Sequence, residues 1–198
     1  MISGPRRRRF EALVAAACLL FPCAAVAGDI SAKELMTLLA SARSARAHFV
    51  ETRYSALLKA PLVSRGTVTY QRPGRMVKHT LAPHEERIVL EAGRLSIENP
   101  TLGNKTEALL SRNPAVAALV ESIRAARAGD LPGLTRHYEV SISGARTQWR
   151  IVLVPRAPEL AEYVDAVTIA GHGARITRIE VQEASGDRTV TDIDEELK

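Results

Sequence analysis

Apolar side chains recur along this chain at two spacings, and each spacing predicts one kind of secondary structure. Leu35 and Leu39 stand one helical turn apart behind Ser31, a capping residue with Glu34 three positions further on. This pattern predicts an amphipathic helix over residues 32–45.

The second helix is predicted between Asn113 and Gly129, whose residue types are typical of a helix N-cap and of the residue that closes a helix. Its apolar stripe consists of Val116, Leu119, Val120 and Ile123. Glu121, Arg124 and Arg127 are expected to face away from that stripe.

Between and after these helices, short β-rich runs are bounded by proline and glycine, which predicts antiparallel strands with short connections. The expected strands are residues 49–54, 63–71, 76–81, 87–91, 94–98, 138–143, 148–154, 163–170, 175–183 and 188–193. Residues 99–113 are expected to be a long loop, and residues 130–136 a further short helical turn. The prediction is one α+β domain with about nine or ten strands and two main helices.

Some strands carry apolar residues on both alternating sets. Trp149, Ile151 and Leu153 form one set, and Val152 and Val154 belong to the other. A sheet with one solvated face would have polar residues on the second set. Two interpretations stay open: a sheet simply packed against its helices, or a curved sheet that encloses an apolar cavity for a lipid chain.

The first 27 residues have the order of a secretory signal. Arg6–Arg9 form a positive segment, Ala12–Phe21 is apolar, and Ala25–Ala27 offers a small-x-small cleavage site. The uncharged stretch is shorter than the ~20 residues that span a bilayer, which makes a retained anchor the weaker alternative. We expect cleavage after Ala27 and a mature domain of residues 28–198. Sec and twin-arginine export both stay open.

Removal of this signal changes the composition of the chain. The full sequence carries 27 basic and 22 acidic residues, a net charge of +5, and four of the basic residues lie in the signal with one acidic residue. The mature domain would carry about +2, which indicates no nucleic-acid partner. Cys18 and Cys23 would leave with the signal, and Phe21-Pro22 makes lipidation of Cys23 unfavourable. We therefore expect no disulfide and no cysteine metal ligand.

No enzyme motif stands out, and we expect no enzyme, cofactor or metal. Serine-hydrolase, zinc-protease and nucleotide-binding signatures are absent from the sequence. His79, His84 and Glu85 flank a turn at a spacing that fits no standard metal site, and solvated loop residues are the simpler interpretation. Three other histidines stand near element ends: His48, His137 and His172. The acidic run near the C-terminus is expected to be solvated: Asp192, Asp194, Glu195 and Glu196.

Several short motifs resemble the LolA family of periplasmic lipoprotein carriers, and more closely its LolA-like branch. They are Phe49-x-Glu51, Val68-x-Tyr70-x-Arg72-Pro73-Gly74-Arg75, Lys78-x-Thr80-Leu81-x-Pro83-x-Glu85, Val89-x-Glu91-x-Gly93-x-Leu95-x-Ile97, and Gly129-Asp130-Leu131 followed by Tyr138 and Trp149. The order of strand, Arg-Pro, strand, proline, strand, turn and strand is typical of that family. The resemblance extends over nearly the whole mature chain.

The resemblance implies a strongly curved antiparallel sheet, an incomplete β-barrel, that helices close over an apolar cavity for acyl chains. It implies that Arg72 ties the helical lid to the sheet; the alternative is a surface residue at a strand end. The residues expected to line or close the cavity are Phe49, Val68, Tyr70, Val77, Leu81, Ile88, Leu90, Leu95 and Ile97. Each of these residues is also consistent with plain core.

The leading hypothesis is a soluble periplasmic carrier that takes acyl chains of a lipoprotein or lipid toward the outer membrane. An inner-membrane donor complex or exporter and an outer-membrane acceptor are its expected partners. Glu51 stands where the main branch has an amide, and aromatic residues make up only 4% of the chain, which leaves the cargo open. One alternative is an accessory module that docks on a membrane exporter through a sheet edge. A hydrolase with widely separated catalytic residues is the other.

Overall fold

The computed structural model describes residues 29–41, 44–72, 74–112 and 114–195. In these ranges the chain forms one antiparallel sheet of eleven strands in the order β6-β5-β4-β3-β2-β1-β11-β10-β9-β8-β7. The predicted signal and its cleavage after Ala27 lie outside the described residues, so the start of the mature domain stays a prediction.

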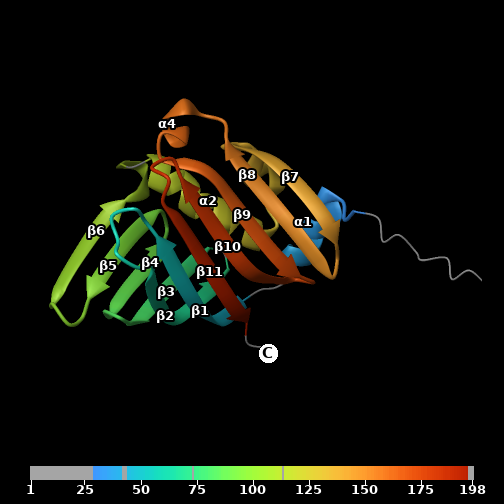
Figure 1. The fold of residues 1–198 in the computed structure, drawn as a ribbon. Coiled ribbons are helices and arrows are strands. Elements are labelled where there is room, and N and C mark those ends of the chain that lie inside the picture. The colour runs from blue at the N-terminus through green and yellow to red at the C-terminus, as the bar shows by residue number, and fades with distance from the viewer. Residues whose placement is uncertain (1–28, 42–43, 73, 113, 196–198) are drawn as a thin grey trace, which may run out of the picture.

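The strands form two meanders that are joined in the middle of the sheet. Each strand from β1 to β6 pairs with the next, each strand from β7 to β11 does the same, and β11 pairs with β1 (Figure 1). Strands β6 and β7 lie at opposite edges, so the sheet is open. The strands are β1 (Ser44–Tyr54), β2 (Leu62–Gln71), β3 (Arg75–Ala82), β4 (Glu86–Glu91), β5 (Arg94–Asn99), β6 (Asn104–Leu109), β7 (Tyr138–Ala145), β8 (Gln148–Pro155), β9 (Val164–His172), β10 (Arg175–Glu183) and β11 (Arg188–Glu195).

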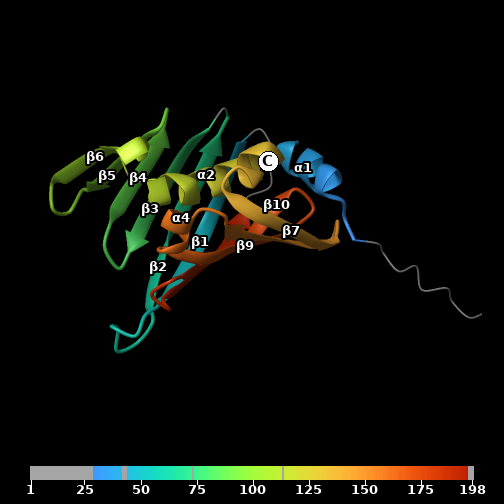
Figure 2. The same cartoon turned by 90° about the horizontal axis from the view of Figure 1, so that it is seen from above.

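The two main helices lie in the trough of a curved sheet. Figure 2 shows the two halves of the sheet folding around α2, with α1 beside it. The helices are α1 (Ala32–Ala40), α2 (Pro114–Ala128), α3 (Leu131–Thr135) and α4 (Pro158–Ala161), with a 3₁₀ turn η1 (Leu110–Arg112). The expected curved antiparallel sheet with two main helices is therefore confirmed. In the described ranges, no helix combines the length and the apolar character needed to cross a bilayer.

Helix α1 begins as predicted and ends earlier. The backbone N–H of Glu34 donates to Ser31 Oγ at 3.2 Å, which is the expected N-cap. At the other end, Ser41 Oγ donates to the carbonyl of Leu38 at 2.6 Å and satisfies one of the last helical carbonyls. The helix therefore ends at Ala40, five residues before the predicted end.

Strand β6 is a strand that the sequence pattern did not indicate. Residues 99–113 were expected to be a loop, and they contain β6 and η1. Every residue of this edge strand is exposed, so neither of its faces is covered, and it pairs only with β5. Its sequence, NKTEAL, therefore needs no alternating apolar set, and the sheet has eleven strands instead of the nine or ten expected.

The main core lies between the helices and strands β7–β10. Trp149, Ile151 and Leu153 of β8 are at most 2% exposed, and they pack with the apolar sides of α1, α2 and α3. On the other set of β8, Val152 is half-buried and Val154 is 45% exposed. The helices thus cover one face of this half of the sheet, and the second apolar set lies on the opposite face.

Gly129 lets α1 and α2 approach each other closely. It adopts φ +70° after the last turn of α2, a conformation that glycine adopts without strain. A Cβ atom there would lie 2.1 Å from the carbonyl oxygen of Met36 in α1 and 2.8 Å from Cβ of Ala40. The two helices are therefore joined by a contact that admits no side chain.

Candidate functional site

Most residues expected to line a cavity share the face of the sheet that α2 covers, which we call the inner face. Directly opposed residues of neighbouring antiparallel strands lie on the same face, as in the series Tyr70, Met76 and Leu90 across β2, β3 and β4. Seven of the nine expected residues belong to this face: Phe49, Val68, Tyr70, Ile88, Leu90, Leu95 and Ile97. Phe49, Tyr70 and Leu90 are buried, and the other four are half-buried.

The other two expected residues lie elsewhere. Val77 is opposite Thr69 and Val89, which puts it on the outer face of the sheet. Leu81 lies at a bulge where β3 loses register with β2, and it is 57% exposed. Neither residue lines the cavities of the inner face described below, because strand alternation and the bulge direct them away from α2.

A narrow apolar cavity lies between α2 and the inner face, and we call it the apolar slot. It has a volume of about 60 Å³. Its lining comes from α2 and from strands on both sides of β1: Ala45, Ala47, Val68, Tyr70, Met76, Ile123, Arg127, Ile176, Ile179, Ile193 and Glu195. Apart from Tyr70, Arg127 and Glu195, the slot is lined by aliphatic and thioether side chains.

Arg127 faces the slot, so the prediction that it points away from the apolar stripe was wrong. It lies one helical turn after Ile123 and is only 4% exposed. Its Nη1 donates to the carbonyl of Ala174 at 3.0 Å, and its guanidinium lies 5.9 Å from the centre of the Tyr70 ring. A buried guanidinium on α2 thus contacts both the sheet and a β-turn.

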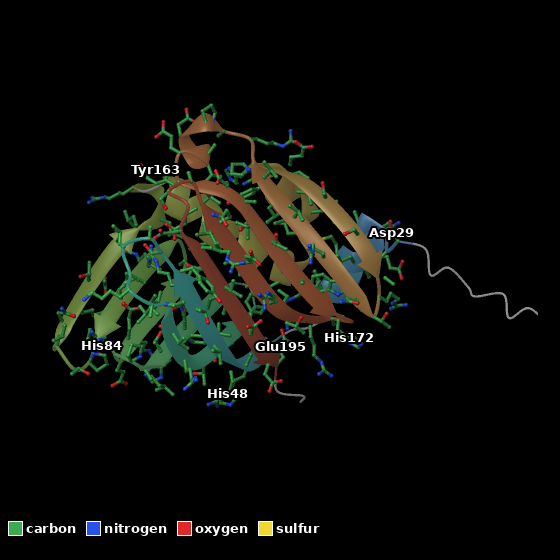
Figure 3. All side chains as sticks on the ribbon, in the orientation of Figure 1. Asp29, His48, His84, Tyr163, His172 and Glu195 are labelled. Atoms are coloured by element: carbon green, nitrogen blue, oxygen red, sulfur yellow. The ribbon has the colours of Figure 1, made fainter. Side chains whose placement is uncertain are left out.

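Glu195 is the partner of Arg127, so the expectation of a solvated acidic terminus was wrong for this residue. Its carboxylate lies 3.5 Å from Arg127 Nη2, and its side chain is 11% exposed. Strand β11 continues to Glu195 opposite Ala47 of β1 (Figure 3 labels Glu195), which places the carboxylate on the inner face. Burial raises the pKa of the Glu195 carboxyl, while Arg127 and the backbone N–H of Ile176 act to lower it.

Arg72 contacts the end of α1. Its Nη2 donates to the carbonyl of Ala40, the last residue of that helix, although the side chain is exposed. The final carbonyls of a helix lack helical partners and carry partial negative charge, which favours a cation at this position. Arg72 therefore links the end of β2 to α1; its release when a ligand enters stays a prediction.

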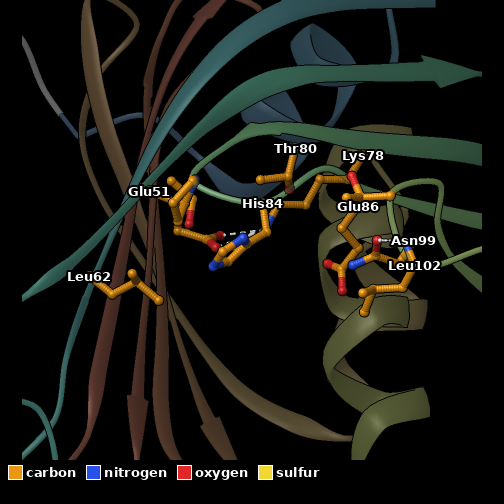
Figure 4. Close-up of a pocket in the computed structure, with 11 residues that line it drawn as sticks. Glu51, Leu62, Lys78, Thr80, His84, Glu86, Asn99 and Leu102 are labelled. Carbon is orange, nitrogen blue, oxygen red and sulfur yellow. Dashed lines mark hydrogen bonds and ion pairs between the residues drawn. The ribbon is translucent and has the colours of Figure 1, made fainter.

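A larger and open cavity, which we call the open pocket, lies further along the inner face (Figure 4). It has a volume of about 510 Å³. Lys78 Nζ donates to both carboxylate oxygens of Glu51 at 2.8 Å, and Thr191 Oγ1 donates to the same carboxylate at 3.1 Å. The lining residues are Glu51, Leu62, Ser64, Lys78, Thr80, Pro83, His84, Glu86, Asn99, Thr101 and Leu102.

The inner face changes from apolar to polar along the direction of its strands. On β1, Ala47 lines the slot and Glu51 lines the open pocket; on β2, Val68 and Ser64 do the same. Four residues of extended chain span about 13 Å, which is the distance over which the change occurs. The inner face therefore offers an apolar end beneath α2 and a polar end beyond it.

The histidines give no sign of a catalytic or metal centre in the described ranges. His79 lies within β3, and its Nε2 is 2.9 Å from Glu85 Oε1 across the β3–β4 turn. His48, His84 and His172 lie well apart from one another (Figure 3). No group of three or more histidine, cysteine or acidic side chains in the described part of the chain is arranged to hold a metal ion.

Residues 24–194 match the sequence model of the family described as "Outer membrane lipoprotein carrier protein LolA-like", and the chain belongs to that family. A LolA superfamily protein from Nitrosomonas europaea is similar in structure, with a TM-score of 0.46 and 14% identity over 85% of this chain and 94% of that one. A DUF1329 family protein from Desulfovibrio piger gives a TM-score of 0.44 and 10% identity over 82% and 90% of the two chains. No curated protein matches this chain.

Proposed function

We propose that this chain is a periplasmic carrier that holds acyl chains of a lipid or lipoprotein between α2 and the inner face. The observation that carries the proposal is the apolar slot, where Ile123 of α2 faces aliphatic residues such as Val68 and Ile179 across unfilled space. Membership of a lipoprotein-carrier-like family and the predicted export signal support the same assignment. The proposed activity is reversible binding, with no covalent step.

An acyl chain needs more room than the slot has. Sites for small molecules have volumes of ~300–1,000 Å³, and the slot has about 60 Å³. Because α2 forms one wall of the slot, we propose that α2 moves outward together with α1, to which it is joined at Gly129. Loading would then separate Arg72 from Ala40 and weaken the contact of Arg127 with Glu195.

The energy of burial is sufficient for such a movement. Each buried CH₂ group contributes ~0.8 kcal/mol, so about ten of them contribute roughly 8 kcal/mol. Loss of the exposed hydrogen bond of Arg72 costs about 1 kcal/mol, and disruption of the Arg127–Glu195 pair costs at most about 3–5 kcal/mol. The hydrocarbon chain therefore supplies most of the affinity, and the polar contacts set how readily the helices open.

The proposal is tested by lipid binding. The purified protein is expected to bind the uncharged hydrophobic dye N-phenyl-1-naphthylamine, and native mass spectrometry is expected to detect co-purified lipid. The Ile179→Asn variant, which places an amide in the slot, should lower dye affinity at least tenfold. Thr177→Asn, at an exposed site on the same strand, is the matched control and should bind like the wild type.

Circular dichroism of both variants separates loss of binding from loss of fold. A folded wild-type protein that binds neither dye nor lipid would overturn the proposal. If that protein instead formed a stoichiometric complex with a membrane exporter, the alternative of a docking module would be favoured.

A further inference from the structure

The polar end of the inner face is a built site that acyl-chain binding does not explain. Glu51 and Lys78 are about three-quarters buried, with side-chain exposures of 23% and 30%. Lys78 Nζ also lies 5.0 Å from the centre of the Phe49 ring, at the boundary between the open pocket and the apolar slot. A charged pair held in place next to the apolar end would contact the polar part of any ligand that extends out of the slot.

The charges in this pocket disfavour an anionic ligand. Two carboxylates, Glu51 and Glu86, stand against one ammonium group, that of Lys78, and the remaining titratable side chain of the lining is His84. Both oxygens of Glu51 already accept from Lys78, so a phosphate would have to compete for a paired cation in a pocket of net negative charge.

The uncharged groups of the pocket suit hydroxyl-bearing ligands instead. Ser64, Thr80 and Thr101 supply hydroxyl groups, and Asn99 supplies an amide, each of which can donate and accept. Carboxylates accept from ligand hydroxyls, and Leu62 offers an apolar surface to ring C–H groups. The cavity of about 510 Å³ is within the ~300–1,000 Å³ range of small-molecule sites.

From these features we infer that the open pocket binds an uncharged, hydroxyl-rich headgroup, so that the favoured cargo is a glycolipid whose acyl chains occupy the slot. The inference rests on the proposed carrier function and names the cargo class of the same site. The roughly 13 Å between Ala47 and Glu51 along β1 separates the chain end of the site from its headgroup end.

The test uses probes with one tail and different headgroups. Dodecyl glucoside, dodecylphosphocholine, dodecyl phosphate and a dodecanoylated neutral tetrapeptide compete, below their critical micelle concentrations, for displacement of N-phenyl-1-naphthylamine from the full mature domain. Dodecyl glucoside is expected to displace the dye at a concentration at least tenfold lower than dodecyl phosphate. Equal or stronger displacement by dodecyl phosphate or by the tetrapeptide would overturn the inference.

Substitutions test whether the pocket is responsible. Glu51→Gln combined with Glu86→Gln removes both carboxylates, and the glucoside-to-phosphate preference should fall at least tenfold. Glu86→Gln alone keeps the Glu51–Lys78 pair and should give part of the change in headgroup preference. This single variant keeps the test usable if the double variant does not fold. The matched control is Glu98→Gln combined with Glu107→Gln. These two residues are exposed, and they lie on the neighbouring strands β5 and β6.

The possible failures are distinguishable. Absence of dye binding by folded wild-type protein would overturn the carrier function itself. Dye binding without a headgroup preference, or a preference that the double variant leaves unchanged, would overturn only the assignment of the open pocket.

Discussion

The guanidinium of Arg127 in α2 lies 3.5 Å from the carboxylate of Glu195 in β11 at the edge of the apolar slot, with Arg127 buried and the Glu195 side chain 11% exposed. Buried ion pairs are costly to desolvate, and removal of one member leaves an uncompensated charge. The pair therefore specifies where α2 lies on the sheet, and its rupture has a measurable consequence for stability.

The Arg127→Met variant should be destabilised by about 3–5 kcal/mol, because Glu195 would keep its burial and lose its counter-charge. Arg127→Met combined with Glu195→Gln should recover most of that loss. Urea denaturation of the single and double variants measures both values. A double variant as unstable as Arg127→Met alone would show that packing of Arg127, and not its charge, is what matters.

The stability of the protein should depend on pH through Glu195. Because burial raises the pKa of this carboxyl in the folded state, the folded protein binds the proton more tightly than the unfolded chain does. Relative to Glu195→Gln, the wild type should therefore be most stable below about pH 4.3, the ordinary glutamate pKa. It should lose stability as pH rises through the raised pKa. Denaturation curves across that interval measure the difference, and a gain of stability with rising pH would contradict the expected sign.

Replacement of Arg72 should change binding kinetics more than stability. Arg72 is exposed and contributes one hydrogen bond to the end of α1, so Arg72→Ala should cost no more than about 1 kcal/mol in unfolding free energy. If this contact holds α1 closed, the variant should bind and release N-phenyl-1-naphthylamine several-fold faster in stopped-flow measurements. Unchanged rates with unchanged stability would show that Arg72 is a surface residue that does not hold α1 in place.

Gly129→Ala should lower the free energy of unfolding by clearly more than the cost of placing an alanine at φ +70°. The added Cβ would lie 2.1 Å from the Met36 carbonyl oxygen and would push α1 away from α2. Gly173→Ala is the matched control, since Gly173 also has positive φ (58°) and an added Cβ there would meet no atom within 4 Å. The difference in melting temperature between the two variants isolates the helix–helix contact. Equal melting temperatures would mean that α1 and α2 can move apart at this contact at little cost in stability.

The turn signals predicted most of the sheet, whereas polar residues in structural roles escaped prediction. Strand β6 has no apolar alternation because both of its faces are exposed, and its pairing with β5 supplies the stability that its sequence does not indicate. Arg127 was assigned to the solvated side of α2 because it is charged. Its position one turn after Ile123 was the available signal that it lies on the apolar stripe.

Partners distant in sequence could not be identified from spacing. Glu195 meets Arg127 only because β11 pairs with β1, and Glu51 meets Lys78 only because β2 lies between their strands. The inner-face residues of β2–β5 were easier to predict, since local hairpins determine which of their side chains share a face. The resemblance led us to expect Val77 at the cavity, and its register places it on the outer face.

The most direct test of the carrier function is to find where a bound acyl chain lies. The uncharged methyl ester of a fatty acid with a photoreactive diazirine at its tail is bound to the protein and illuminated, and the labelled residues are identified by peptide mass spectrometry. The account predicts labelling of slot residues such as Met76, Ile123 and Ile179. Labelling confined to outer-face positions such as Val89 and Val154, or no labelling above that of unfolded protein, would contradict it.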